Sequence, residues 1–279
     1  MRVRLWLPLG LVAVVATTVV LTTSFGRDPW RTDCAGPLVA PKAASGSAAA
    51  VQAAVAASAK GATVGYEVLD LSACRVVAGV NSQQRFAAAS VVKLLIALDA
   101  LDRQGEQAED RVQRMLSVSD DATASALWTA HGGPEIVKRV AGKLKLGGVR
   151  PPERAGQWGD TQVTAHDVAL VYRHISAAET KDRRRLLTSA MAEAPRAAAD
   201  GFDQHFGIPD GLPGSRWAIK QGWGSSGERT VLHSTGLVGG DRQYAVVLLS
   251  SWPLGMDRMA AGRALTAGAG RVSEPAAAH

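Results

Sequence analysis

The sequence has few of the residues from which metal centres and nucleotide sites are built. Its 279 residues include 2 cysteines and 6 histidines, and the histidines lie far apart, with no His-x-x-His and no His/Cys cluster. A metal site is therefore not expected. No Gly-x-Gly-x-x-Gly stands between a strand pattern and a helix pattern, so Gly236, Gly239 and Gly240 are interpreted as turn residues. The sequence predicts a protein without a cofactor.

Aromatic residues make up only 5% of the chain, and no long stretch carries charge of one sign. The formal net charge is +6 with a pI near 9.6. Because Lys and Arg are intermixed with Asp and Glu, nucleic-acid binding is not expected. Trp217, Trp223 and Trp252 are interpreted as core or cleft-wall residues rather than as a base-stacking platform. With 47% hydrophobic residues the chain can bury a full core, and we expect a monomer.

One apolar run at the N-terminus is long enough to enter a membrane. It extends from Leu5 to about Thr23, follows Arg2 and Arg4, and is closed by Arg27. This pattern predicts that residues 1–27 are a signal peptide or an uncleaved anchor, and that the remainder is extracytoplasmic. Residues 28–46, rich in Pro, Gly, Ala and Ser, are predicted to be a linker. Residues 47–272 are predicted to form the working domain, and 273–279 a disordered tail.

The two cysteines, Cys34 and Cys74, both lie in the exported part of the chain. An oxidising compartment would allow them to pair and so pin the linker to the domain. Two cysteines carry too little spacing information to decide between a disulfide and two unrelated small residues.

Periodicity in the domain predicts two strands, a block of helices, three strands and a final helix. Strand patterns cover residues 63–69, 75–80, 217–220, 230–237 and 243–250, with Gly-rich turns at 224–227 and 239–240. Helix patterns cover 47–60, 91–101, a stretch from Asp120 or Asp121 to Leu127, a stretch from His166, and 256–267. Residues 147–164 are interpreted as a loop. This order predicts an α+β fold in which an antiparallel sheet receives a helical insertion.

A Ser-x-x-Lys stands at the start of the most apolar helix pattern. Ser90 is the one serine in the sequence with a lysine, Lys93, three places on. One helical turn would bring the amine beside the hydroxyl. A serine hydroxyl is a weak nucleophile at neutral pH, and a lysine whose pKa is lowered by burial can serve as its base. By itself the motif is weak, but its place at the start of a buried helix directly after a hairpin favours a catalytic role.

From residue 64 to 101 the sequence resembles the opening of class A β-lactamases and related penicillin-binding proteins. That family carries Ser-x-x-Lys, Ser-Asp-Asn and Lys-Thr-Gly in this order. Here Ser119-Asp120-Asp121 and Lys220-Gln221-Gly222 stand at the second and third places. The resemblance covers about residues 47 to 270. It implies the β-lactamase/transpeptidase-like fold, with an antiparallel sheet flanked by helices, a mainly helical lobe and a cleft between them.

The resemblance also implies roles for individual residues. Ser90 would form an acyl-enzyme, Lys93 would take its proton, Ser119 would relay a proton to the leaving group, and Lys220 would supply positive charge. The backbone N–H groups of Ser90 and Trp223 would bind the oxyanion. The predicted substrate-binding residues are Asp121, Gln221, Gly222, Trp223 and Arg229. For Arg229, either contact with a substrate carboxylate or a solvated hairpin position fits the sequence.

Several departures from the family pattern affect the predicted chemistry. The carboxylate of Asp121 cannot donate a hydrogen bond as an asparagine amide does, and its charge would raise the pKa of Lys93. Gln221 replaces a threonine hydroxyl with an amide donor. In class A enzymes a loop glutamate activates the deacylating water. Here the loop ending in Gly159-Asp160-Thr161 offers only Glu153, which is interpreted as a solvated acid.

The sequence therefore predicts an extracytoplasmic serine hydrolase or acyltransferase that deacylates slowly. Its predicted substrates are a β-lactam, a cell-wall peptide amide or an ester, and its membrane contact runs through the N-terminal segment. The alternative is a non-catalytic protein of the same fold that binds cell-wall peptide or a partner.

Overall fold

The computed structural model describes residues 31–34, 38, 46–240 and 243–273. The predicted membrane segment, residues 1–27, lies outside the described residues. Most of the linker and all but the first residue of the predicted tail lie outside them as well. None of the described helices is long and apolar enough to cross a membrane.

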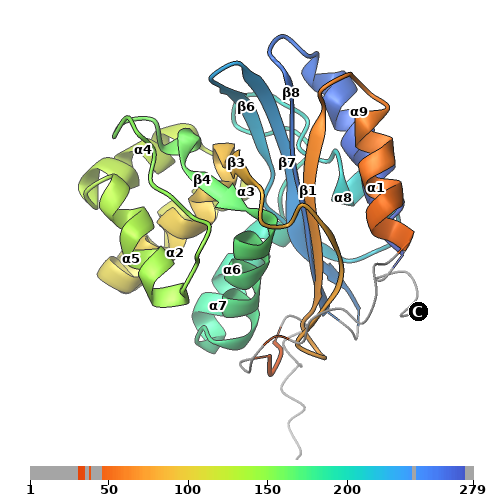
Figure 1. Ribbon diagram of the computed structural model, residues 1–279. Helices are drawn as coiled ribbons and strands as arrows, with labels where there is room; N and C mark the ends of the chain where they lie inside the picture. Colours follow the sequence, from red (N-terminus) through yellow and green to blue (C-terminus); the bar gives the residue numbers. More distant parts are fainter. Residues whose placement is uncertain (1–30, 35–37, 39–45, 241–242, 274–279) are drawn as a thin grey trace, which may run out of the picture.

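A sheet of six antiparallel strands forms the centre of the molecule (Figure 1). Its strands are β1 (Thr63–Asp70), β2 (Arg75–Val80), β5 (Trp217–Ile219), β6 (Gly222–Ser226), β7 (Arg229–Gly239) and β8 (Gln243–Pro253). The order is β2-β1-β8-β7-β5, and β6 also pairs with β7. β7 therefore carries β5 on one half of its length and β6 on the other. Strands β1 and β8 lie far apart in the sequence but pair over eight residues, which joins the N-terminal hairpin to the C-terminal strands.

Helices cover both faces of the sheet. On one face pack α1 (Gly46–Ala56) and α9 (Arg258–Ala269), which contact each other (Figure 1). On the other face lies the helical lobe, which consists of α2 (Lys93–Gln104), α3 (Glu109–Ser117), α4 (Asp121–Ala130), α5 (Pro134–Leu144), α6 (Ala165–Ala177) and α7 (Lys181–Ala192). The short α8 (Ile208–Gly211) precedes β5. Two apolar cores result, one between the sheet and each helical layer. The predicted α+β architecture is confirmed.

The central helix α2 is buried along most of its length, from Lys93 to Leu101. Its residues are apolar on nearly all sides except for Lys93 and Asp99. Asp99 accepts two hydrogen bonds from Arg139 and lies 3.0 Å from His131 Nδ1. Because its buried charge is paired in this way, the helix can lie inside the lobe and present its N-terminal end at the boundary with the sheet.

The structure adds two features to the elements predicted from sequence. Residues 224–227 are predicted as a turn, but 224–226 belong to strand β6 (residues 222–226). The backbone of β6 pairs with residues 229–233 of β7. The predicted loop 147–164 contains β4 (Gln162–Thr164), which pairs with β3 (Arg85–Ala87). Both additions lie beside Ser90. The cysteines, left undecided by the sequence, are joined as a Cys34–Cys74 disulfide.

Candidate functional site

Ser90 lies in a tight turn between β3 and α2, at the boundary of the sheet and the helical lobe. The turn is the 3₁₀ helix η1 (Ala89–Val92), and it continues directly into α2. Ala89 has a φ of 44°, in the left-handed region that side chains disfavour. Backbone strain of this kind, of order 1 kcal/mol or more, is often found at functional sites. The Ser90 side chain lies at the edge of a cleft and makes no side-chain hydrogen bond to any of the described residues.

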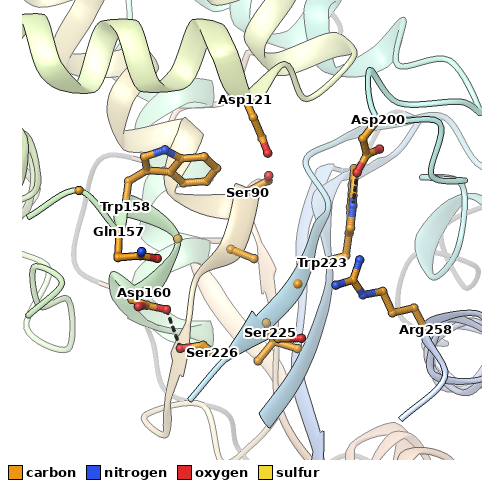
Figure 2. A pocket seen from close by; sticks show the side chains of 15 residues that line it. Ser90, Asp121, Gln157, Trp158, Asp160, Asp200, Trp223, Ser225, Ser226 and Arg258 are labelled. Atoms are coloured by element: carbon orange, nitrogen blue, oxygen red, sulfur yellow. Dashed lines mark hydrogen bonds between the residues drawn. The ribbon is translucent and has the colours of Figure 1, made fainter. Parts of the chain in front are cut away.

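The cleft has a volume of about 380 Å³ and runs between the helical lobe and β6 (Figure 2). Its polar and aromatic lining residues are Ser90, Asp121, Gln157, Trp158, Asp160, Asp200, Trp223, Ser225, Ser226 and Arg258. Gly222 allows β6 to lie against the turn that carries Ser90, since a Cβ there would be 3.0 Å from the Ala88 carbonyl oxygen. The strand edge and the serine therefore form one surface.

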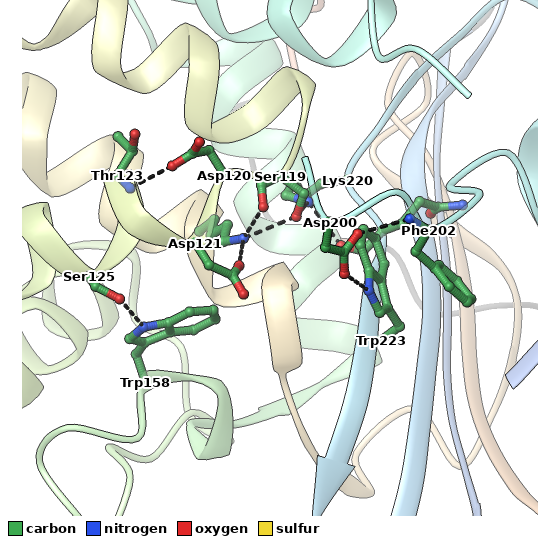
Figure 3. Close-up of polar contacts among 12 residues, drawn as sticks. Ser119, Asp120, Asp121, Thr123, Ser125, Trp158, Asp200, Phe202, Lys220 and Trp223 are labelled. Carbon is green, nitrogen blue, oxygen red and sulfur yellow. Dashed lines mark hydrogen bonds and ion pairs between the residues drawn. The ribbon is translucent and has the colours of Figure 1, made fainter. Parts of the chain in front are cut away.

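Ser119 stands between two buried lysines (Figure 3). Its Oγ is 3.0 Å from Lys93 Nζ and 2.9 Å from Lys220 Nζ. The backbone of Ser119 is left-handed, with a φ of 55°, and Asp120 caps the following helix α4 by accepting from Thr123 N–H. The three motifs predicted from sequence thus meet in space: Lys93 from the first, Ser119 from the second and Lys220 from the third.

The donors of Lys93 are fully engaged. Its Nζ donates to the Ser119 carbonyl at 2.7 Å, to Ser119 Oγ, and to Asp121 Oδ1 at 2.5 Å. These are three acceptors for the three protons of an ammonium group. The Lys93 side chain is 0% exposed and that of Asp121 is 69% exposed. The predicted contact between Lys93 and Ser90 is not made as a hydrogen bond in this state, because the amine is directed at Ser119 and Asp121 instead.

The pKa of Lys93 lies below its ordinary value, because burial disfavours the ammonium form more than the hydrogen bond and charge of Asp121 favour it. The predicted effect of Asp121 on this pKa therefore has the right sign but is outweighed by burial. Lys220 has a pKa well below its ordinary value, first because it is buried and second because Lys93 repels its charge. The pair shares one hydroxyl, so the site is suited to moving a proton between two amines and Ser119.

Gln221 does not reach the cleft, which corrects its predicted substrate-binding role. Its amide Nε2 donates to the Phe206 carbonyl at 2.6 Å, and its Oε1 accepts from Thr235 N–H at 3.1 Å. Both ends of the buried side chain therefore hold neighbouring backbone. Lys220 and Gln221 lie between β5 and β6, and their side chains have different partners: Lys220 donates to Ser119, and Gln221 donates to the Phe206 carbonyl.

Arg229 also lies outside the cleft. Its guanidinium donates to the Gly61 carbonyl at 2.7 Å and to the Ser251 carbonyl at 3.0 Å, across the end of the sheet. The arginine that lines the cleft is Arg258, at the start of α9 (Figure 2). Among the described residues its side chain has no hydrogen bond or ion pair. No local sequence signal singles out Arg258, since only the tertiary fold brings α9 to the cleft.

The cleft walls contain two tryptophans, of which only Trp223 was predicted from the sequence as a core or cleft-wall residue. Trp223 donates from Nε1 to Asp200 and stacks on Phe202 with ring centroids 5.1 Å apart. On the facing wall Trp158 lies under Lys93, with Nζ 5.1 Å from the ring centroid. Trp223 agrees with its predicted cleft-wall position. Trp158 and Asp200 were not predicted, although Trp158 directly precedes the Gly159-Asp160-Thr161 stretch that marked this loop.

The predicted loop offers no free carboxylate to the cleft in the described structure. Glu153 is exposed and does not line it. Asp160 does, but its Oδ1 accepts from Ser226 Oγ at 2.7 Å and its Oδ2 lies 3.5 Å from Arg154. Asp121 and Asp200, the other acids of the cleft, are held by Lys93 and Trp223.

Comparison with known proteins agrees with this geometry. Residues 47–108 match a family model described as the β-lactamase enzyme family. The chain is 36% identical over 208 residues to LppW of Mycobacterium tuberculosis and of Mycobacterium bovis, which is named as a lipoprotein. The match covers 71% of this chain and 66% of LppW, so the chain spans just under two thirds of that relative.

Solved structures share the fold at low sequence identity. A class A β-lactamase from Bacteroides cellulosilyticus superposes with a TM-score of 0.65 at 15% identity, covering 81% of this chain and 96% of that protein. The structure of PBP-A superposes with a TM-score of 0.66 at 18% identity, covering 86% and 97%. Together with the six-stranded sheet flanked by helices, these likenesses show that the chain has the β-lactamase/transpeptidase-like fold, within which residues 47–108 match the β-lactamase enzyme family.

Proposed function

We propose that the protein is an extracytoplasmic serine hydrolase or acyltransferase that forms an acyl-enzyme on Ser90 and releases it slowly. The observation that carries the proposal is the position of Ser119 Oγ, within 3.0 Å of both Lys93 Nζ and Lys220 Nζ. Lys93 also donates to Asp121, which lines the same cleft as Ser90. Such an arrangement can activate a hydroxyl and protonate a leaving group. Expected substrates are a β-lactam, a peptide amide or an ester.

Acylation requires the neutral form of Lys93. The amine takes the proton of Ser90 Oγ as that oxygen bonds to the substrate carbonyl carbon, and the N–H groups of Ser90 and Trp223 receive the oxyanion. When the carbonyl reforms, its bond to the leaving nitrogen or oxygen breaks. Ser119 gives that atom a proton and recovers one from Lys93 through the 3.0 Å hydrogen bond. The amine is then neutral again and Ser90 carries the acyl group.

Asp121 slows the first of these steps. At 2.5 Å from Nζ its carboxylate favours the ammonium form of Lys93, which cannot accept a proton. An asparagine in its place would leave the amine freer to reach Ser90. The carboxylate therefore acts as a brake on acylation.

Deacylation lacks an evident base among the described residues. Glu153 is solvated and outside the cleft, and Asp160 is held by Ser226 and Arg154. A water molecule near the acyl carbonyl would find no free carboxylate on that loop, so the ester on Ser90 is expected to persist.

The envelope location rests on the basic N-terminal flank and apolar run of residues 1–27, and the name of LppW agrees with it. A second candidate function is binding without chemistry. The engagement of all three Lys93 donors by Ser119 and Asp121 favours it, since Lys93 in this arrangement makes no hydrogen bond to Ser90.

Labelling with a fluorescent penicillin separates the two. The enzyme predicts slow labelling of the wild type and no labelling of Ser90→Ala, while Ser189→Ala, which changes a serine on α7 remote from the cleft, labels as the wild type does. Nitrocefin hydrolysis measured alongside should be far slower than labelling. Absence of label from the wild type with β-lactam and ester donors would favour the binding protein. Rapid nitrocefin turnover would contradict slow deacylation.

A further inference from the structure

A second cavity of about 200 Å³ adjoins the cleft at the far end of β6. Its lining includes Arg85, Gln162, Ser226, Arg229 and Ser251. Ser226 also lines the main cleft, as does Val231, so the two cavities meet at the end of the strand. The proposed chemistry leaves this cavity unused.

The chemistry of this cavity is that of an anion site. Two arginines, Arg85 and Arg229, line it, and no acidic side chain is among its lining residues in the described structure. Arg85 Nε donates to the Gly148 carbonyl at 2.8 Å, while its terminal nitrogens have no acceptor among the described residues. Arg229 is fixed by the Gly61 and Ser251 carbonyls through Nη2, and its Nη1 is free of any described acceptor. Two held arginines with unused donors match a carboxylate or phosphate group.

The acidic residue between the two cavities, Asp160, already has a partner at each carboxylate oxygen. Asp160 lies on the cleft side of Ser226 and accepts its hydroxyl proton at 2.7 Å (Figure 2). Its other oxygen faces Arg154 at 3.5 Å. An anionic group passing Ser226 therefore meets a carboxylate whose oxygens are both already paired.

The geometry also says which part of a substrate reaches the cavity. Ser119, which would protonate the leaving group, lies beside Lys220, two residues before β6 begins at Gly222 (Figure 3). Ser225 and Ser226 lie at the other end of β6, beyond Trp223 (Figure 2). With the leaving group at Ser119, the acyl part of the substrate runs along β6 towards Ser226. Three residue steps along the extended strand lead from Trp223 to Ser226, a distance of about 10 Å.

We propose that the cavity between Arg85 and Arg229 is a subsite for an anionic group carried on the acyl side of the substrate, about 10 Å from the reacting carbonyl. This rests on the proposed function for its direction, but binding of the anion does not require the chemistry. The substrate class is thereby narrowed to extended acyl donors with a carboxylate or phosphate at that reach.

Peptide methyl esters of the form succinyl-(Gly)n-alanine, with n from 0 to 4, test the subsite. Each is compared with its succinamoyl partner, in which an amide of the same shape replaces the carboxylate. Calorimetric binding to the full chain carrying Ser90→Ala should favour the succinyl form by about tenfold at n = 1, where the extended chain from the ester carbonyl to the succinyl carboxylate spans about 10 Å, and by little at n = 3 or 4. Arg85→Gln and Arg229→Gln should each abolish the preference.

Arg258→Gln is the matched control, because it removes an arginine of the same size from the main cleft and should leave the length-dependent preference in place. Arg229 also contributes hydrogen bonds to the sheet, so thermal unfolding of each variant is measured first, and Arg85→Gln decides the test if Arg229→Gln fails to fold.

Equal binding of both caps at every length, or a preference for the succinyl cap that survives Arg85→Gln, would overturn the subsite. The ester reaction in the wild type is read separately by mass. A preference for the succinyl cap without acylation of Ser90 would contradict the proposed chemistry and support the subsite. Acylation of Ser90 without that preference would support the chemistry and contradict the subsite.

Discussion

Replacing Asp121 by asparagine tests how the site controls its own base. The carboxylate lies 2.5 Å from a lysine that is 0% exposed, but is itself 69% exposed, so solvent screens much of the attraction. A charge-assisted hydrogen bond discounted for that exposure contributes about 1.4 kcal/mol to the ammonium form. Removing it lowers the pKa of Lys93 further and raises the neutral population about tenfold. Acylation of Ser90 should accelerate by about the same factor.

The assay is the rate of fluorescent-penicillin labelling under pseudo-first-order conditions between pH 5 and 9. In the wild type the rate rises with pH as Lys93 loses its proton, and in Asp121→Asn the rise moves to lower pH. Glu135→Gln, which removes one charge from a surface pair with Lys138 on α5, serves as the control and should not move the profile. A labelling rate that falls tenfold in Asp121→Asn would refute the reasoning, since the carboxylate would then be required for the chemistry.

Three further predictions follow from particular contacts. Ser119→Ala removes the hydroxyl shared by the two lysines and should slow labelling by about 10²- to 10⁴-fold, the usual range for a lost proton relay, with thermal stability measured to exclude unfolding. Burial lowers the pKa of His233 to about 4, so the unfolded chain binds more protons than the folded chain between pH 6.5 and 4. The free energy of unfolding therefore falls by about 3 kcal/mol as the pH drops through that window. In urea unfolding, His233→Asn should lose this pH-dependent component, and an unchanged pH dependence would contradict the prediction. The Cys34–Cys74 disulfide joins cysteines that are 40 residues apart, so its reduction should lower the free energy of unfolding by about 4 kcal/mol through loop entropy. The melting temperature should fall in dithiothreitol, and a Cys34→Ala/Cys74→Ala variant should show the same lower value without reductant.

Much of the fold could be predicted because the sequence patterns are local. The mainly apolar runs of β1 and β8, which are buried on both faces of the sheet, and the continuous apolar run of α2 each indicate their own burial. The order of elements then restricts the assembly to an antiparallel sheet with a helical insertion. β6 was not predicted as a strand because its Gly and Ser residues have low strand propensity and depend on pairing with β7.

The sequence predicted the site residues whose spacing a motif fixes along one helix. It predicted less well the partners of these residues, because the partners depend on how separate helices and strands pack. Ser-x-x-Lys places Ser90 and Lys93 one turn apart. Sequence spacing could not tell that Lys93 turns towards Asp121, because that depends on how α4 lies against α2. The sequence pointed to Arg229 as a cleft residue and carried no signal for Arg258, which reaches the cleft only through the packing of α9 on the sheet.

The most direct measurement is the intact mass of the wild-type protein after incubation with benzylpenicillin, followed by peptide mapping. The account predicts one added penicilloyl group, located on Ser90 and retained for much longer than it takes to form, and no addition to Ser90→Ala. An unmodified protein under conditions that acylate a penicillin-binding protein, or an adduct on any other residue, would contradict the claim that these side chains form an acyl-transfer site.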